Sequence, residues 1–164
     1  TARSAIAALN TLHAAAGANG CIEGLEEPLR SPHDAALAEL QALARFPLAI
    51  DESFHHWPDP VLAPVQRLVL KPGVVGGLRV SLALARRAQA AGKQVVVTSL
   101  VESACGLWSS AQLAAATGSP LAHGLATADW LAEDLGTPPC IRHGYLTLPE
   151  APGSGFVPDA AARS

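Results

Sequence analysis

The chain has 164 residues, of which 49% are hydrophobic, and a formal net charge of -3. This length is sufficient to bury the core of one domain, and the charge balance excludes the basic surface that nucleic-acid binding requires. No apolar run approaches the roughly 20 residues that a membrane helix needs. The composition therefore predicts one soluble domain with no nucleic-acid or membrane partner.

Three cysteines, Cys21, Cys105 and Cys140, are scattered along the chain without the spacing of a metal site. Cys21 and Cys105 fall in segments that we expect to belong to the core. Disulfides form mainly in oxidising compartments, and isolated cysteines of this kind are typical of a reducing one. The cysteine pattern thus indicates a reduced, cytoplasmic protein.

The first predicted element is an amphipathic helix over residues 4–16. Ile6, Leu9 and Leu12 fall on roughly one side of it, and Gly17 provides a stop signal. The chain begins without a methionine and enters this helix at once, so we expect it to be a fragment of a longer protein.

Apolar runs and helical patterns then alternate along the chain. Each run has the length of a buried strand, and each helical pattern has its own start or stop residues. Ser31 as cap and Pro32 as first helical residue predict the start of the second helix, and Gly92 predicts the end of the third. We expect strands at 21–25, 47–50, 67–70 and 94–98 with a weaker one at 121–123, and helices from 31, over 78–91 and from 103 to 118.

A charged residue follows each of the first three strands. Glu26, Asp51 and Lys71 stand where the apolar runs end, at spacings of 25 and 20 residues. Such spacings suit successive βα units, whose strand ends meet at one edge of a parallel sheet. We therefore expect the two carboxylates and the ammonium to face a common cavity, which indicates metal-assisted chemistry on an anion.

Four or five βα units in series favour part of a barrel over an open doubly wound sheet. No glycine-rich phosphate loop follows the first strand, and several consecutive strand ends carry reactive residues, as in barrel enzymes. A complete barrel needs about 250 residues. The expected fold class is α/β, with the C-terminal portion of a TIM-like barrel over residues 1–135 and an irregular C-terminal tail over 136–164.

Four motifs in order resemble the enolase superfamily, and within it they look most like the o-succinylbenzoate synthase family. The motifs are Leu-Glu-Glu-Pro at 25–28, Ile-Asp-Glu-Ser at 50–53, Leu-Lys-Pro at 70–72 with Gly76-Gly77, and Thr-Ser-Leu-Val-Glu-Ser at 98–103. The resemblance spans roughly residues 23–134 and implies a (β/α)7β barrel with parallel strands and intervening helices.

The resemblance implies roles for individual residues. Glu26 and Asp51 would bind the essential Mg²⁺, and Lys71 would be the catalytic lysine that faces the substrate. Thr98 and Ser99 would contact the substrate carboxylate. Independently of the family, a hard cation takes carboxylate oxygens as ligands and stabilises the charge that forms when a proton beside a carboxylate is removed.

Gly76 and Glu102 complete the expected substrate site. Gly76, just before a helix, can expose backbone N–H groups toward an anionic substrate. Glu102 has a structural alternative as an acid at a helix start, and Asp51 has one as a cap of the following turn. Glu26 by itself could equally be a solvated loop acid.

The chain also departs from the family pattern. The family has a third metal carboxylate and a Lys-x-Lys pair on earlier strands, whereas Lys71 and Lys93 are the only lysines here. An N-terminal capping domain and the first barrel strands are absent as well. We therefore expect the missing N-terminal part of the same protein to be this chain's partner, and the chain to be inactive alone.

The reaction implied by the resemblance is that of a lyase. A small-molecule carboxylate substrate, 2-succinyl-6-hydroxy-2,4-cyclohexadiene-1-carboxylate, would lose water to give o-succinylbenzoate in menaquinone or phylloquinone biosynthesis. An N-acylamino acid racemase or dipeptide epimerase of the same superfamily, a Schiff-base aldolase and a degenerate non-catalytic barrel remain as alternatives. A dipeptide epimerase usually has an Asp-x-Asp pair where this chain has His123-Gly124-Leu125, which favours the synthase.

Overall fold

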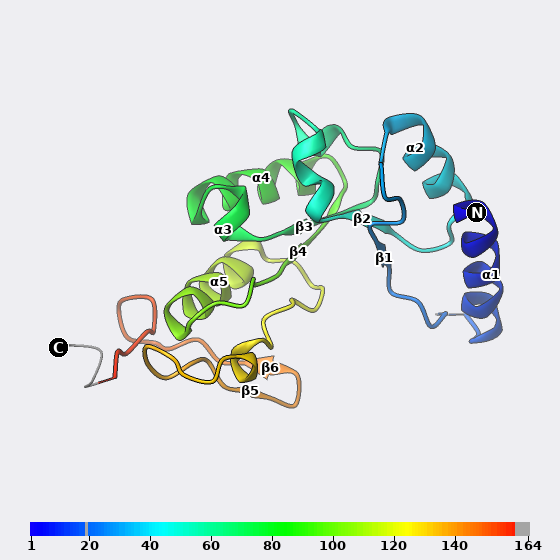
Figure 1. The fold of residues 1–164 in the computed structure, drawn as a ribbon. Coiled ribbons are helices and arrows are strands. Elements are labelled where there is room, and N and C mark those ends of the chain that lie inside the picture. The colour runs from blue at the N-terminus through cyan, green and yellow to red at the C-terminus, as the bar shows by residue number, and fades with distance from the viewer. Residues whose placement is uncertain (19, 160–164) are drawn as a thin grey trace. The chain divides into compact units, whose positions relative to one another are not determined.

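The computed structural model describes residues 1–18 and 20–159 (Figure 1). Its contacts divide the chain into two units. Unit 1 comprises Thr1–Val69 and Arg87–Gln94, and unit 2 comprises Leu70–Arg86 and the chain from Val95 onward. The strands of the main sheet follow the order β1-β2-β3-β4, which is their order along the chain.

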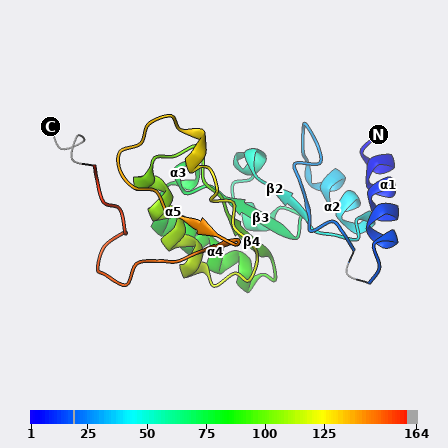
Figure 2. The same ribbon diagram turned by 90° about the horizontal axis from the view of Figure 1, so that it is seen from below.

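Unit 1 is built on parallel strands. β1 (Leu25–Glu26) pairs in parallel with β2 (Leu48–Ile50), and β2 pairs in parallel with β3 (Arg67–Leu70), beside which it runs in Figure 2. Every residue of β2 and β3 is buried. Parallel strands that are covered on both faces have no solvent side, which is why these segments read as continuous apolar runs. The predicted parallel sheet is confirmed.

β1 is shorter than the predicted strand 21–25, because its ladder ends at a proline. The backbone N–H of Leu25 donates to the carbonyl oxygen of Pro47 (2.9 Å), but Pro47 has no N–H to donate to the carbonyl oxygen of Glu23, two residues earlier. The carbonyl oxygen of Glu23 accepts instead from the guanidinium of Arg67 (3.1 Å), a residue that is only 6% exposed. At Gly24 a Cβ atom would lie 2.8 Å from Arg67 Nη1, so a larger residue there would displace the guanidinium.

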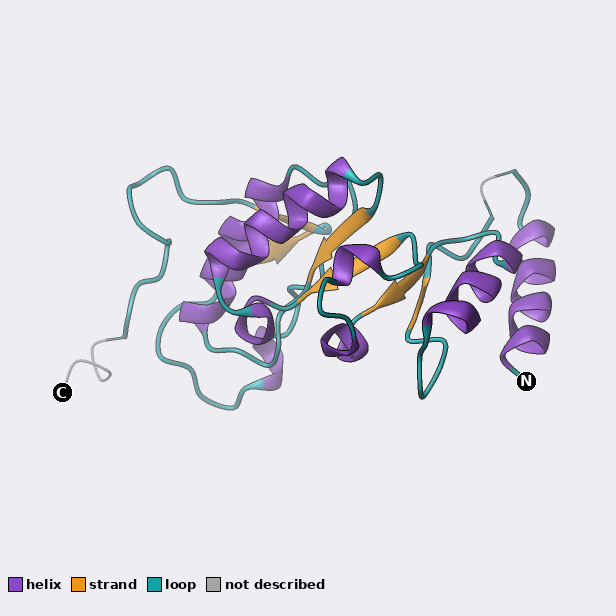
Figure 3. Ribbon diagram, turned by 90° about the horizontal axis from the view of Figure 1, so that it is seen from above, coloured by secondary structure: helices purple, strands orange, loops and turns teal. Residues whose placement is uncertain are grey.

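Two helices of unit 1, α1 (Ala2–Ala15) and α2 (Asp34–Leu43), lie side by side (Figure 3). A capping box starts α1. Of the predicted apolar side, only Ile6 is buried, whereas Leu12 is 59% exposed. α2 begins later than predicted, because its N-cap is His33 and not Ser31. The His33 ring Nδ1 accepts from a backbone N–H in the first turn (3.3 Å), which performs the role expected of the serine hydroxyl.

The expected alternation of strand and helix continues after β3, mostly in unit 2. α4 (Leu78–Ala90), β4 (Gln94–Val97) and α5 (Ala104–Thr117) lie within one or two residues of the predicted bounds. α3 (Pro72–Val75) was not predicted; proline stands at its first turn and the left-handed Gly76 ends it. One face of α5 packs with β4 in a core cluster of Val97, Ala111, Leu113, Ala114 and Leu125.

The weaker strand predicted at 121–123 does not form. A single parallel bridge joins Thr98 to Gly124, whose N–H donates to the carbonyl oxygen of Val97 (2.9 Å). The N–H of Val97 donates to the ring Nδ1 of His123 (2.9 Å). A side chain thus takes the place of a backbone acceptor, and regular pairing ends there.

The predicted irregular tail holds one short antiparallel hairpin, formed by β5 (Ile141–Arg142) and β6 (Tyr145–Leu146). The domain boundary at residue 135 stays a prediction. No helix in the described ranges is long and apolar enough to cross a membrane. All three cysteines are free and exposed, so the expectation that two of them lie in the core was wrong. Cys105 is on the outward side of α5, next to the buried Ala104.

Replacing Leu68 by alanine should strongly destabilise the protein. Leu68 lies in the centre of β3 with none of its surface exposed, and such a truncation costs about 2–5 kcal/mol of unfolding free energy. Leu62→Ala is the matched control, because Leu62 is 75% exposed and its loss should cost less than about 0.5 kcal/mol. Urea unfolding monitored by circular dichroism measures both, and equal losses would contradict the packing described.

His123 should make stability depend on pH. Burial lowers the pKa of His123 from its ordinary 6.5, so the folded state favours the neutral ring. Since the unfolded chain binds the proton more readily, His123 contributes stability above pH 6.5 that is lost as the pH falls through the lowered pKa. In His123→Asn, whose amide oxygen can accept the same N–H without titrating, unfolding free energies should fall less between about pH 7 and pH 5. The same decrease in parent and variant would refute this role.

Candidate active site

Glu26 and Asp51 occupy the carboxyl ends of neighbouring parallel strands in unit 1. Glu26 is the exposed last residue of β1, and the half-buried Asp51 directly follows β2. Glu26 pairs in register with Ala49, two residues before Asp51. Because the pair is parallel, both acidic residues belong to the edge at which barrel enzymes place their chemistry. Their role as metal ligands stays a prediction.

Asp51 does not cap the turn that follows it. It occupies the N-cap position of the 3-10 helix η1 (Glu52–His56) without a side-chain capping hydrogen bond. The neighbouring Glu27 supplies that bond, because its Oε1 accepts from the backbone N–H of Ser53 at 2.9 Å. The structural alternative for Asp51, as a capping residue, is therefore wrong.

The Glu27 carboxylate connects the ends of the two strands. Its Oε1 also accepts from the backbone N–H of Asp51 (2.6 Å) and from the hydroxyl of Ser53 (2.8 Å). The sequence reasoning missed this residue and treated it only as part of a motif. The signal available was the doubled glutamate: two adjacent acidic side chains at a strand end point in different directions, so they cannot serve the same purpose.

In unit 2, Lys71 directly follows β3 and is half-buried at the N-cap position of α3. The only other lysine, Lys93, stands before β4, at the amino end of a strand. Its ammonium donates to the carbonyl oxygens of Ala63 (2.7 Å) and Val65 (2.5 Å), and burial lowers its pKa. Lys93 thus satisfies backbone groups inside unit 1, which leaves Lys71 as the candidate catalytic lysine.

Gly76 and Glu102 line the same hollow of about 350 Å³ in unit 2. Glu102 Oε2 accepts from the hydroxyl of Ser110 on α5 (3.1 Å). A Cβ at Gly106 would lie 3.0 Å from that of Glu102, so the glycine lets this carboxylate pack closely on the helix. These contacts give Glu102 a structural role against the side of α5, whose first N–H, of Ala104, donates to Asp134 Oδ1 (2.7 Å).

The expectation that Gly76 exposes N–H groups to an anionic substrate was wrong, because the N–H groups of Gly76 (3.3 Å) and Gly77 (2.8 Å) both donate to the carbonyl oxygen of Pro72. Substrate binding in the hollow stays a prediction.

Thr98 and Ser99 differ in how well their hydroxyls are satisfied. Ser99 is 8% exposed, and its hydroxyl shares a hydrogen bond with that of Thr127 (2.8 Å). Thr98 Oγ1 is buried and has no hydrogen-bond partner among the described residues. A buried hydroxyl without a partner is costly unless water or a ligand satisfies it. Of the two, Thr98 is therefore the better candidate for a substrate contact.

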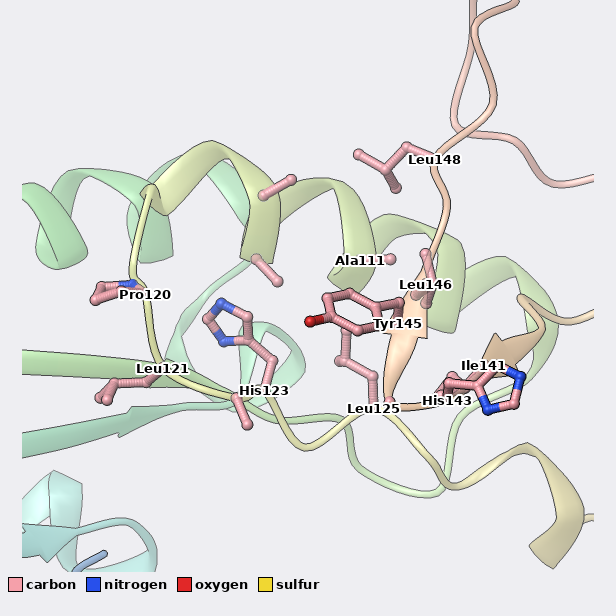
Figure 4. A pocket seen from close by; sticks show the side chains of 14 residues that line it. Ala111, Pro120, Leu121, His123, Leu125, Ile141, His143, Tyr145, Leu146 and Leu148 are labelled. Atoms are coloured by element: carbon pink, nitrogen blue, oxygen red, sulfur yellow. The ribbon is translucent and has the colours of Figure 1, made fainter. Parts of the chain in front are cut away.

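A second hollow of unit 2, of about 550 Å³, lies between α5, residues 120–125 and the β5-β6 hairpin (Figure 4). Its walls are mainly aliphatic, and the Tyr145 hydroxyl points toward the ring of His123. None of the predicted site residues lines it. Predicted site residues therefore line the smaller hollow, at Gly76 and Glu102, and not this larger one.

The donor set agrees with Mg²⁺ in kind but is incomplete in number. Glu26 and Asp51 offer carboxylate oxygens, which a hard cation prefers. Within residues 1–18 and 20–159, no group of three or more His, Cys, Asp or Glu side chains is placed to hold a metal ion. The common cavity expected for Glu26, Asp51 and Lys71 stays a prediction, since these residues belong to different units.

Curated proteins similar to the chain include two o-succinylbenzoate synthases. The synthase of Thermobifida fusca is 36% identical over 133 residues, which are 77% of this chain and 40% of that protein. The synthase of Mycobacterium tuberculosis is 37% identical over 143 residues, which are 82% of this chain and 41% of that protein. The chain therefore spans about two fifths of the length of these relatives.

Solved structures with similar folds belong to several enzymes. A muconate lactonizing enzyme from Pseudomonas fluorescens matches with a TM-score of 0.79 and 26% identity over 99% of this chain and 44% of that one. An N-succinyl Arg/Lys racemase from Bacillus cereus matches with a TM-score of 0.81 over 99% of this chain and 43% of that one; at 22% identity it shows the fold alone.

The family model for enolase C-terminal domain-like proteins matches residues 1–162. This match covers nearly the whole chain, and it agrees with the parallel strands and with the acidic residues at their carboxyl ends. The expected TIM-barrel-like class is thereby confirmed. The protein belongs to the enolase superfamily, whose C-terminal barrel fold it shares.

Proposed function

We propose that this chain is the C-terminal barrel portion of an o-succinylbenzoate synthase, a lyase that removes water from 2-succinyl-6-hydroxy-2,4-cyclohexadiene-1-carboxylate. The observation that carries the proposal is the 36% and 37% identity to two synthases over most of the chain. The positions of Glu26 and Asp51 at the ends of β1 and β2 support it.

The reaction requires removal of a proton beside a carboxylate, which leaves two negative charges on one small group. Mg²⁺, when bound, supplies positive charge to substrate oxygens as these charges develop. In this chain, Glu26 and Asp51 would hold the ion through carboxylate oxygens. The third carboxylate and the lysine pair that takes the proton would come from an N-terminal part of the same protein.

Lys71 would act as a second cation at the site. Lys71 follows a buried strand and is a half-buried residue. A charge that is partly removed from water is less screened than one on an open surface. Lys71 would stabilise the substrate as negative charge develops. The buried Thr98 hydroxyl would donate to a substrate carboxylate.

An N-acylamino acid racemase is the alternative within the superfamily, and there Lys71 would instead transfer a proton. A cytoplasmic location agrees with three free cysteines and is part of the same proposal. The decisive assay supplies the complete enzyme with the cyclohexadiene carboxylate and, separately, with an N-acylamino acid. Racemisation without formation of o-succinylbenzoate would replace the synthase by the racemase, and neither activity would contradict both.

Removing either proposed ligand should abolish magnesium-dependent turnover. Glu26→Gln and Asp51→Asn each delete one negative ligand outside the core, so the fold should persist while Mg²⁺ affinity falls by more than the roughly 10- to 100-fold typical of losing an outer-shell partner. Titration calorimetry of the complete enzyme with magnesium chloride measures the loss of affinity, and circular dichroism measures whether the fold persists. Glu133→Gln, at an exposed position, is the control and should bind like the parent. Unchanged affinity in both ligand variants would refute the assignment.

Lys71→Ala should reduce kcat more than it raises KM, because the ammonium is needed most when charge develops. Loss of one preorganised donor to an oxyanion costs about 10²- to 10³-fold in rate, and we expect a decrease of that size. Lys93→Gln is the contrasting variant: it should lower the unfolding midpoint, since Lys93 satisfies two buried carbonyls, but keep kcat within a few-fold. Steady-state kinetics of the complete enzyme would contradict this role if Lys71→Ala stayed within a few-fold of the parent.

A further inference from the structure

Glu27 has an unusual backbone for a residue with a long side chain. Its φ is +47°, in the left-handed region that non-glycine residues rarely occupy. Its N–H still donates to the carbonyl oxygen of Ala49 (3.0 Å), as the parallel ladder requires. The chain turns at this residue, directly after β1 ends at Glu26.

The turn replaces a backbone acceptor by a side-chain acceptor. The next N–H that faces β1 after that of Ala49 belongs to Asp51, directly after β2. It donates to Glu27 Oε1 at 2.6 Å. The same oxygen accepts from the N–H and the hydroxyl of Ser53, which is 5% exposed. One carboxylate oxygen therefore joins the end of β1 to three donors that begin directly at Asp51.

We propose that Glu27 is the positioning residue of the metal site, a proposal that rests on the function proposed above. Glu27 holds the Asp51 backbone by a direct hydrogen bond and is itself the next residue after Glu26. The two proposed ligands are thereby connected through one rigid contact. Its strained backbone agrees with such a role, since residues in disfavoured conformations persist where surrounding contacts over-determine them.

The role depends on the reach of the side chain and not on its charge. Glu27→Gln keeps the length and an oxygen acceptor but removes the charge, whereas Glu27→Asp keeps the charge but is one methylene shorter. A positioning role therefore predicts that Gln is tolerated and Asp is not. A purely electrostatic contribution to the cation predicts the opposite order.

The test is calorimetric titration of the complete protein with magnesium chloride. We expect Glu27→Asp to weaken Mg²⁺ binding by about 10- to 100-fold, as for the loss of an outer-shell partner, and Glu27→Gln by no more than about 3-fold. Glu133→Asp, which shortens an exposed carboxylate elsewhere, should match the parent. A second measurement without metal is amide hydrogen exchange at Asp51 and Ser53, which should accelerate in Glu27→Asp and stay near the parent rate in Glu27→Gln.

The outcomes separate the positioning role from the function itself. A parent protein that binds no Mg²⁺ would overturn the proposed function, and with it the metal-directed role of Glu27. A parent that binds Mg²⁺, together with a Glu27→Asp variant of equal affinity or a Glu27→Gln variant that is weaker than Glu27→Asp, would overturn the positioning role alone. Faster exchange with unchanged Mg²⁺ affinity would also overturn it, because the contact would then be structural only.

Discussion

The candidate site depends on the parallel register between β1 and β2, which aligns Leu25 with Leu48 and Glu26 with Ala49. Only two residue pairs form this ladder, so backbone bonds by themselves specify the register weakly. A slip of one residue would move every side chain of the shifted strand to the other face and would separate the acidic residues. The contacts at the two ends of the ladder are therefore as important as the ladder.

At each end of this strand pair a charged side chain takes over from the backbone. On the amino side, Pro47 offers no N–H, and the buried Arg67 donates to the free carbonyl of Glu23. On the carboxyl side, the Glu27 carboxylate accepts from Asp51 and Ser53. These side-chain hydrogen bonds end the backbone ladder on both sides, and they hold the register of the two strands.

In unit 2 some polar residues of the motifs have hydrogen-bond partners within the unit, and another has none. The hydroxyl of Ser99 and the carboxylate of Glu102 both have partners within the unit, from Thr127 and Ser110. Thr98 Oγ1 is buried without one in the described residues. Lys71 follows the carboxyl end of its strand. Lys93, which belongs to unit 1, precedes the amino end of the next strand, where it satisfies two carbonyls. These differences decide which of the motif residues are worth testing for a direct role.

The sequence by itself determined the order of strands and helices and the placement of Glu26, Asp51 and Lys71 at strand ends. Those features are local: an apolar run and the residue that follows it lie within a few positions of each other. The tertiary structure alone decided that Glu27 bonds to residues 24 and 26 positions away and that the His123 ring accepts from a backbone N–H of β4. The structure also showed that α2 starts at Asp34, after the cap His33. The His33 cap is local, but a histidine competes poorly with serine in a sequence pattern. The other contacts depend on strand register and on one left-handed φ, which bring distant residues together and which no local pattern records.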